Sequence, residues 1–339
     1  MRFSEGLEPP SPRHVCFLKK SLYGLKEASR QWYARLAGAL SFKGYTSSLN
    51  DYSLFFKTTG GLISIISVYV DDILLTGDAI SKILDVTHFL NAEFQVKMLG
   101  DINYFLGMEI IREASGFIIS QRQFTMNLLK EFDCTGSSVS SPLDPYMKLQ
   151  ADDGPLLDNP TEYRHLVGKL NFLTHTRPDL SYAILCLSQY MQQHCLSHFS
   201  AAQRVLRYLR EDPGQGILLS STPSYDLLAF CDVDWAFCKD SRRSVCGFFI
   251  TLGGAPISWK SKKQMSISLS SVEAEYRSIR RVTTELTWLV SLLDDLSTPP
   301  SLPIPLHSDR QIAIHIARNN ARNTLIWIVT SCVNNFSLV

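Results

Sequence analysis

The stretch Tyr69-Val70-Asp71-Asp72 lies between two apolar segments, Leu62 to Val68 and Ile73 to Leu75. Two strand-like segments joined by a short turn predict a β-hairpin with both carboxylates at its tip. Adjacent carboxylates are suitable ligands for Mg²⁺, a hard ion that proteins hold through oxygen atoms together with substrate phosphates. An Asp-Asp turn without a chemical role explains the same residues, so this stretch alone leaves both interpretations open.

The composition of the 339-residue chain is that of a globular protein, with 45% hydrophobic and 19% charged residues, and its length suits two or three domains. The net charge of +1 gives no global positive field that would indicate a nucleic-acid partner. Four local basic clusters also fit ordinary solvated surfaces: Lys19-Lys20, Arg242-Arg243, Lys260 with Lys262-Lys263, and Arg280-Arg281.

The eight cysteines lack zinc-binding spacing, so we expect reduced thiols and an intracellular location, in the cytoplasm or nucleus. We expect no membrane partner, because the apolar runs are too short to span a bilayer.

The first part of the chain alternates between helical and strand-like patterns. Helical spacing predicts one helix from Leu25 to Leu40 and a second from Ser81 to Phe94. Gly60-Gly61 predicts a turn into the strand that leads to the paired aspartates. A further ordered segment is expected from Phe105 to Ile111, and residues 134–159 are rich in Ser, Pro, Gly and Asp, which is typical of a linker.

The second part begins with helices and continues as a compact α/β unit. Residues 160–210 have the pattern of three helical pieces, with Pro178 in the first turn of the second piece. The expected α/β elements are the strands Leu227 to Ala236, Val245 to Leu252 and Pro256 to Lys260, a helix from Ser271 to Leu296, a strand Ile304 to Leu306, and a helix Gln311 to Ala317.

A second set of carboxylates lies in this α/β unit. Glu275 shares a helix face with apolar residues, where a charge is costly unless it is compensated by a bound cation or by a salt bridge. Glu273 already has a simpler role, because it forms a capping box with Ser270. Asp232 ends the first strand, and Asp309 follows a later strand, where it can also cap the next helix. Together Asp232, Glu275 and Asp309 predict a strand-helix-strand cluster of the kind that holds two metal ions in nucleases.

Several motifs resemble a known family in their order along the chain. Those that resemble the reverse transcriptase of copia-type retrotransposon Pol polyproteins are Ser21 to Lys26, Tyr69 to Asp72, Tyr104 to Gly107, Thr176 to Asp179 and Arg204 to Leu209. Those that resemble the ribonuclease H of the same family are Asp232 to Ala236, Ile257 to Gln264 and Glu273 to Tyr276. The resemblance implies an α+β fold with an incomplete right-hand polymerase palm and thumb, a helical connection and a ribonuclease H-like α/β domain.

The resemblance also implies roles for individual residues. Asp71 and Asp72 match the polymerase acids, and Asp232, Glu275 and Asp309 match the nuclease acids. The residues that match the contacts to template and incoming nucleotide are Tyr23, Gly24, Lys26, Arg30 and Tyr69. The implied cofactor is Mg²⁺ in two-metal sites, and the implied partners are an RNA template, a DNA primer and an RNA–DNA hybrid.

The chain departs from the family pattern at both ends. We expect a partial reverse transcriptase without fingers over residues 1–133, a linker and helical connection over 134–225, an incomplete ribonuclease H-like domain over 226–319, and a frameshifted tail over 320–339. No aspartate precedes Asp51, so the first polymerase acid of the family is missing. The residues after Asn319 do not match the family, so the last nuclease acid is missing as well. We therefore expect a catalytically defective, truncated copy; the alternatives are a nucleic-acid-binding remnant without catalysis and an unstable pseudogene product.

Overall fold

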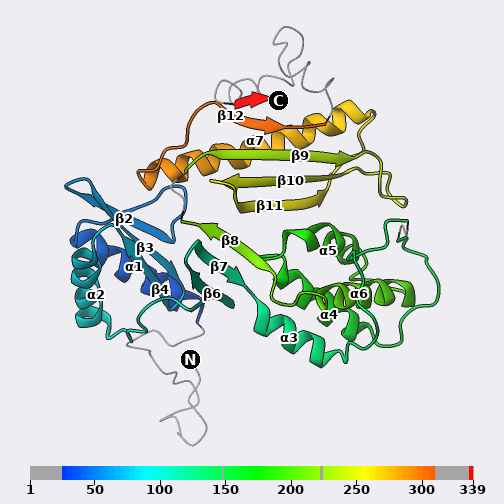
Figure 1. The fold of residues 1–339 in the computed structure, drawn as a ribbon, viewed down its shortest axis with the longest axis horizontal. Coiled ribbons are helices and arrows are strands. Elements are labelled where there is room, and N and C mark those ends of the chain that lie inside the picture. Colours follow the sequence, from blue (N-terminus) through cyan, green and yellow to red (C-terminus); the bar gives the residue numbers. More distant parts are fainter. Residues whose placement is uncertain (1–24, 147–148, 222–223, 310–335, 339) are drawn as a thin grey trace, which may run out of the picture. The chain divides into compact units, whose positions relative to one another are not determined.

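The computed structural model describes residues 25–146, 149–221, 224–309 and 336–338 (Figure 1). The chain divides into two compact units. The first contains Met1–Met98 with Asp295–Ser297, and the second contains Leu99–Asp294 with Thr298–Val339. Within the described residues, no helix is both long enough and apolar enough to cross a bilayer.

The first unit contains a four-stranded antiparallel sheet in the order β1-β2-β3-β4 and two helices. Its elements are α1 (Lys26–Phe42), β1 (Thr46–Ser47), β2 (Leu54–Thr59), β3 (Leu62–Tyr69), β4 (Asp72–Gly77) and α2 (Ile80–Phe94). Alternate side chains of β3 are buried, and Ile66 packs in one core with Leu40 of α1 and Leu90 of α2. The two predicted helices and the predicted β3–β4 hairpin are therefore confirmed.

The second unit begins with another antiparallel sheet in the order β5-β6-β7-β8. Its elements are β5 (Tyr104–Phe105), β6 (Met108–Glu113), β7 (Gly116–Ser120), the helix α3 (Arg122–Glu131) and β8 (Gly216–Ser220). The sequence reasoning missed β8, a short strand whose partner β7 lies far earlier in the chain. The sheet therefore contains strands from both the expected reverse transcriptase segment, 1–133, and the expected linker and helical connection, 134–225. The functional division into these segments remains a prediction.

The helical part contains α4 (Pro160–Leu173), the short 3₁₀ helix η1 (Pro178–Leu180), α5 (Ser181–Ser188) and α6 (Leu196–Leu209). The side chain of Asn159 caps α4 by accepting a hydrogen bond from the backbone N–H of Thr161. Pro178 lies in the first turn of η1, as predicted. The described residues between α3 and α4 form no helix or extended strand, which agrees with the predicted linker.

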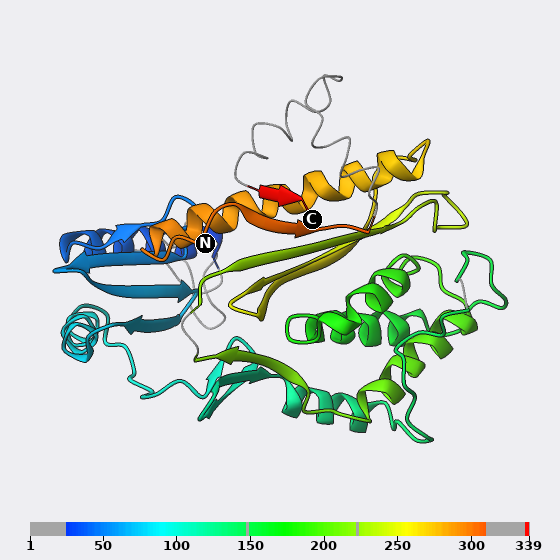
Figure 2. The same ribbon diagram turned by 45° about the horizontal axis from the view of Figure 1, so that its top comes forward.

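The last part is a five-stranded sheet in the order β11-β10-β9-β12-β13 with a long helix, α7, along one face (Figure 2). Its elements are β9 (Leu227–Asp234), β10 (Val245–Leu252), β11 (Ala255–Lys263), α7 (Ser271–Asp295), β12 (Ile304–His307) and β13 (Phe336–Leu338). β9, β10 and β11 pair antiparallel, whereas β12 pairs parallel with β9. Each strand and helix predicted up to Leu306 is confirmed, while the helix predicted at 311–317 lies outside the described residues.

The start of α7 contains only part of the predicted capping box. The hydroxyl of Ser270 accepts a hydrogen bond from the backbone N–H of Glu273, at 3.2 Å, as the motif predicts. The Glu273 carboxylate accepts from the backbone N–H of Leu269 rather than from Ser270, and it also pairs with Arg277. Glu273 is thus occupied at the helix terminus, whereas Glu275, two residues later, is buried.

Candidate functional site

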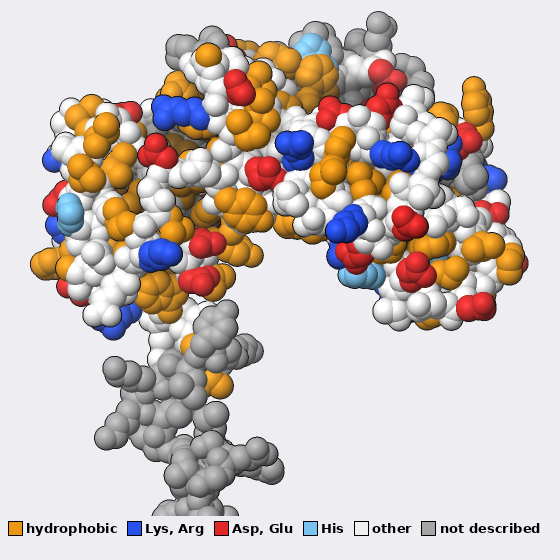
Figure 3. All heavy atoms as spheres, turned by 60° about the horizontal axis from the view of Figure 1, so that its bottom comes forward, with side chains coloured by type: hydrophobic (Ala, Val, Ile, Leu, Met, Phe, Trp, Pro, Cys, Tyr) orange, Lys and Arg blue, Asp and Glu red, His pale blue; other side chains and the backbone are white. Residues whose placement is uncertain are grey.

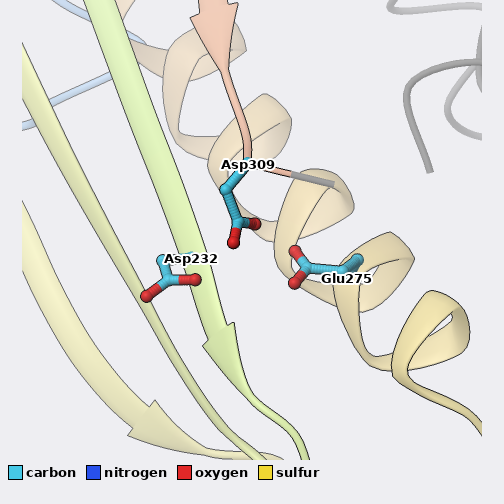
Figure 4. Close-up of side chains that lie close together, drawn as sticks. All are labelled: Asp232, Glu275 and Asp309. Atoms are coloured by element: carbon cyan, nitrogen blue, oxygen red, sulfur yellow. The ribbon is translucent and has the colours of Figure 1, made fainter. Parts of the chain in front are cut away.

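Asp232, Glu275 and Asp309 come together at the end of the five-stranded sheet (Figure 4). Each offers one carboxylate oxygen, and these oxygens all lie within 4.8 Å of one another. Asp232 is near the end of β9, Asp309 follows β12, and Glu275 lies in the second turn of α7. The predicted strand-helix-strand cluster is therefore present in the structure.

The register of two neighbouring strands explains how the aspartates meet. β9 and β12 are parallel, and Phe230 pairs with His307. Continuing this register by two residues places Asp232 beside Asp309. Cys231 and Val233 are buried while Asp232 is exposed, as expected for side chains that alternate across a sheet.

Glu275 reaches the cluster because α7 packs its apolar stripe against the sheet. Ile279, Val282 and Leu286 of that stripe are fully buried, and the side chain of Glu275 is only 1% exposed. The neighbouring Ser278 hydroxyl donates a hydrogen bond to the backbone oxygen of Asp232, at 3.4 Å. The packing of α7 therefore fixes the position of a carboxylate that the two exposed aspartates approach from the strand ends.

The cluster favours a hard cation over a soft one. Cys231 is the nearest sulfur by sequence, but burial and then the charge of Glu275 raise the pKa of its thiol to about 12. A neutral thiol is a poor metal ligand, because metals bind the thiolate form. Carboxylate oxygens are the ligands that Mg²⁺ prefers, so the donors fit this ion. Asp234 points the same way as Asp232 by alternation, but it is not part of this group of three.

The other acid pair lies at the tip of the β3–β4 hairpin. Tyr69 pairs with Asp72, and Asp71 occupies the turn, so both carboxylates are exposed where the sequence predicts. Val70 has a φ of 55°, and its carbonyl oxygen accepts a 2.8 Å hydrogen bond from the indole N–H of Trp32 in α1. Among the described residues, no third acidic, histidine or cysteine side chain joins this pair in a possible metal site.

The remaining residues predicted to contact substrate are only partly described. Tyr69 is 57% exposed beside the hairpin acids. Arg30 is exposed on α1 and forms a 3.6 Å ion pair with Glu27. Lys26 begins α1, and Tyr23 and Gly24 lie outside the described residues, so their predicted roles remain predictions.

The sequence reasoning missed a cleft beside two of these acids. The cleft has a volume of about 590 Å³, and its lining includes Asp232 and Asp309 together with Phe230, Phe249 and His307. Part of the signal was present in the sequence, because Phe230 and His307 each precede an aspartate by two residues and so share its side of the sheet. The pairing of β9 with β12, which brings the two together, is visible only in the structure.

Basic side chains do not gather into a single track on the surface that Figure 3 shows. Among the described residues on that face, Lys and Arg side chains are dispersed among Asp and Glu (Figure 3). This distribution agrees with the net charge of +1. The chemistry of the acidic cluster therefore carries more information about function than the overall field.

Comparison with known proteins identifies relatives over most of the chain. The reverse transcriptase (RNA-dependent DNA polymerase) family matches residues 6–144. The chain is 42% identical over 309 residues to the retrovirus-related Pol polyprotein from transposon RE2 of Arabidopsis thaliana, which covers 91% of this chain and 21% of that protein. It is 38% identical over 224 residues to an uncharacterized mitochondrial protein of the same plant, covering 65% of this chain and 92% of that protein.

A putative transposon Ty5-1 protein of Saccharomyces cerevisiae is 31% identical over 281 residues, which cover 81% of this chain and 91% of that protein. The chain spans about a fifth of the length of the Arabidopsis transposon Pol polyproteins that it matches. The match to the reverse transcriptase family and the extent of these similarities place the chain in the copia-type retrotransposon Pol polyprotein family.

Proposed function

We propose that this chain is a fragment of a retrotransposon reverse transcriptase in which ribonuclease H is the activity that its own residues support. The observation that carries the proposal is the convergence of Asp232, Glu275 and Asp309, with their ligand oxygens within 4.8 Å. The proposed substrate is the RNA strand of an RNA–DNA hybrid, and the proposed cofactor is Mg²⁺.

The three acids have different roles in holding the proposed ions. Bound divalent cations supply an activated water and stabilise the leaving oxygen during phosphodiester hydrolysis. Glu275 is buried and fixed by α7, so it sets the position of the site. Asp232 and Asp309 are exposed and border the cleft, so they face the side from which a phosphate can approach.

We propose that the 339-residue chain has no polymerase activity by itself. Asp71 and Asp72 match the polymerase acids, but two carboxylates from one hairpin under-compensate the charge of two cations. Template RNA and primer DNA remain the proposed partners of the hairpin and of Tyr69 and Arg30, whose exposed side chains are available for contact.

The test is to incubate the purified chain with a labelled RNA–DNA hybrid and Mg²⁺. We expect cleavage of the RNA strand that Asp232→Asn abolishes and that Asp71→Asn leaves unchanged, because the two aspartates belong to different compact units. Glu275→Gln should also abolish cleavage, and Glu273→Gln, two residues earlier on α7, is its matched control and should leave cleavage unchanged. No cleavage above the Asp232→Asn level would refute the proposal, and salt-sensitive hybrid binding without cleavage would favour the non-catalytic alternative.

A further inference from the structure

Two rows of side chains cross the face of the five-stranded sheet that lies opposite α7. Strand register places these residues side by side across β11, β10, β9 and β12. Asp309 is added by continuing the register between β9 and β12 two residues beyond His307. The acid row consists of Ser261, Gly247, Asp232 and Asp309, and the aromatic row consists of Trp259, Phe249, Phe230 and His307. Within each strand the rows are two residues apart, which corresponds to about 6.6 Å.

Both rows line the same cleft. All eight residues border its volume of about 590 Å³, together with Pro178 of η1 and Ser181 at the start of α5. This volume lies within the range of about 300–1,000 Å³ that is common for ligand sites. The aromatic row, Asp232 and Asp309 therefore face one continuous space.

The aromatic row is not part of the core under α7. Cys231 and Phe248, which point to the other face, pack against α7, whereas Phe230 is 41% exposed. His307 stacks on Phe230 with ring centroids 5.1 Å apart and an angle of 20° between the planes. The indole N–H of Trp259 donates a 2.8 Å hydrogen bond to the backbone oxygen of Thr174, which fixes the other end of the row.

We propose that the aromatic row binds unpaired nucleobases of the nucleic acid whose backbone lies at the acid row. Aromatic faces stack on any base, so such a site is tolerant of sequence and does not need a basic track. An apolar protein segment is a poorer occupant, because it would bury His307 and the neighbouring Asp232 without satisfying their polar atoms. The role of the acid row rests on the proposed nuclease function, whereas base stacking does not.

Base stacking at this row implies a preference among substrates. Bases inside a blunt duplex are already stacked on each other, so the row has little to bind there. A hybrid with a single-stranded overhang presents free base faces next to the scissile region. The chain is therefore expected to bind an overhanging hybrid more tightly than a blunt hybrid of the same duplex length.

Binding is measured with the full chain by fluorescence anisotropy in EDTA, using labelled hybrids with and without a thymidine overhang. Phe230→Leu, which keeps apolar volume but removes the ring, should weaken overhang binding about tenfold and leave blunt binding unchanged. Phe230→Tyr should restore the affinity. Phe117→Leu changes another partly exposed Phe, on β7, and should change neither affinity. No loss with Phe230→Leu, or an equal loss on both hybrids, would overturn the proposal.

Photo-crosslinking from 4-thiothymidine in the overhang locates the contact directly. Adducts on Phe230, Phe249 or His307 support the proposal, and adducts only elsewhere overturn it. The same experiment with Asp232→Asn separates the two proposals, because stacking should persist when cleavage is lost. If Phe230→Leu changes the sedimentation coefficient of the free chain, the row is a contact between copies and the proposal is wrong.

Discussion

Replacing Glu275 with glutamine is expected to stabilise the protein in the absence of metal. At the 4.8 Å limit of the cluster, two unit charges repel by about 3.5 kcal/mol at an effective dielectric of about 20 and by about 0.9 kcal/mol in bulk water. Asp232 and Asp309 are exposed, so solvent screening favours the lower end of this range. Removing two such repulsions gains about 2 kcal/mol, and burying an imperfectly bonded amide costs about 1 kcal/mol. The expected net gain is about 1 kcal/mol.

The assay is thermal unfolding of wild type and variant in EDTA and in Mg²⁺. The Glu275→Gln variant should melt about 2–4 °C higher than wild type in EDTA, the usual shift per kcal/mol for a domain of about 150–250 residues. At a Mg²⁺ concentration ten times the Kd, the free energy of unfolding of the wild type should rise by about 1.4 kcal/mol, and that of the variant should rise little. Glu273→Gln should keep the Mg²⁺ response, because Glu273 pairs with Arg277 instead.

The opposite pattern would refute this reasoning. If Glu275→Gln melts below wild type in EDTA and keeps the full Mg²⁺ response, then the buried carboxylate is held by a favourable structural interaction. The salt-bridge interpretation of its place on the apolar stripe would then be correct, and Glu275 would have to be removed from the proposed cation site.

Two further predictions concern the helical part of the second unit. Arg177→Ala should lower the free energy of urea unfolding by about 3 kcal/mol, because the Arg177 side chain is 3% exposed and its partner Asp179, at 2.8 Å, would stay charged. Arg30→Ala, which removes an exposed ion pair, should cost less than about 0.5 kcal/mol. Equal losses in the two variants would contradict the burial argument. Burial lowers the pKa of His194 and His198 below 6.5 in the folded chain, so at acidic pH the unfolded chain binds more protons than the folded chain. The free energy of unfolding should therefore fall as the pH drops below about 6.5. Equal urea midpoints at about pH 7.5 and pH 5.5 would refute this.

The sequence was most informative where one side chain is out of place for its pattern. Glu275 interrupts an apolar helix stripe, and the structure buries it with a carboxylate oxygen within 4.8 Å of those of Asp232 and Asp309, as the predicted cluster requires. Asp71 and Asp72 interrupt an apolar run, and the structure places them at a hairpin tip. In both cases local periodicity was sufficient, because a helix or hairpin is defined by residues close in sequence.

Features that depend on distant pairing could not be found in the same way. The aromatic row needs the register between β9 and β12, and the whole of α7 separates these strands in the sequence. Gly107 is a similar case, since the sequence shows it only as the last residue of the family-like motif Tyr104 to Gly107. Its φ is +82°, and a Cβ at this position would lie 2.5 Å from the Phe172 ring, so α4 also constrains this residue.

The two acid sets depend on different supporting residues, and this determines what the loss of one means for the other. The hairpin acids are held by β3, β4 and the Trp32 contact in the first unit. The acids of the proposed nuclease site are held by β9, β12 and the apolar stripe of α7, which packs in its own core. Because no residue is shared between these supports, a defect in the hairpin that carries Asp71 and Asp72 is not a reason to expect a defect in the proposed nuclease site. Asp71→Asn should therefore leave the Mg²⁺-dependent rise in melting temperature unchanged, so this variant is a suitable background in which to study the proposed nuclease site alone.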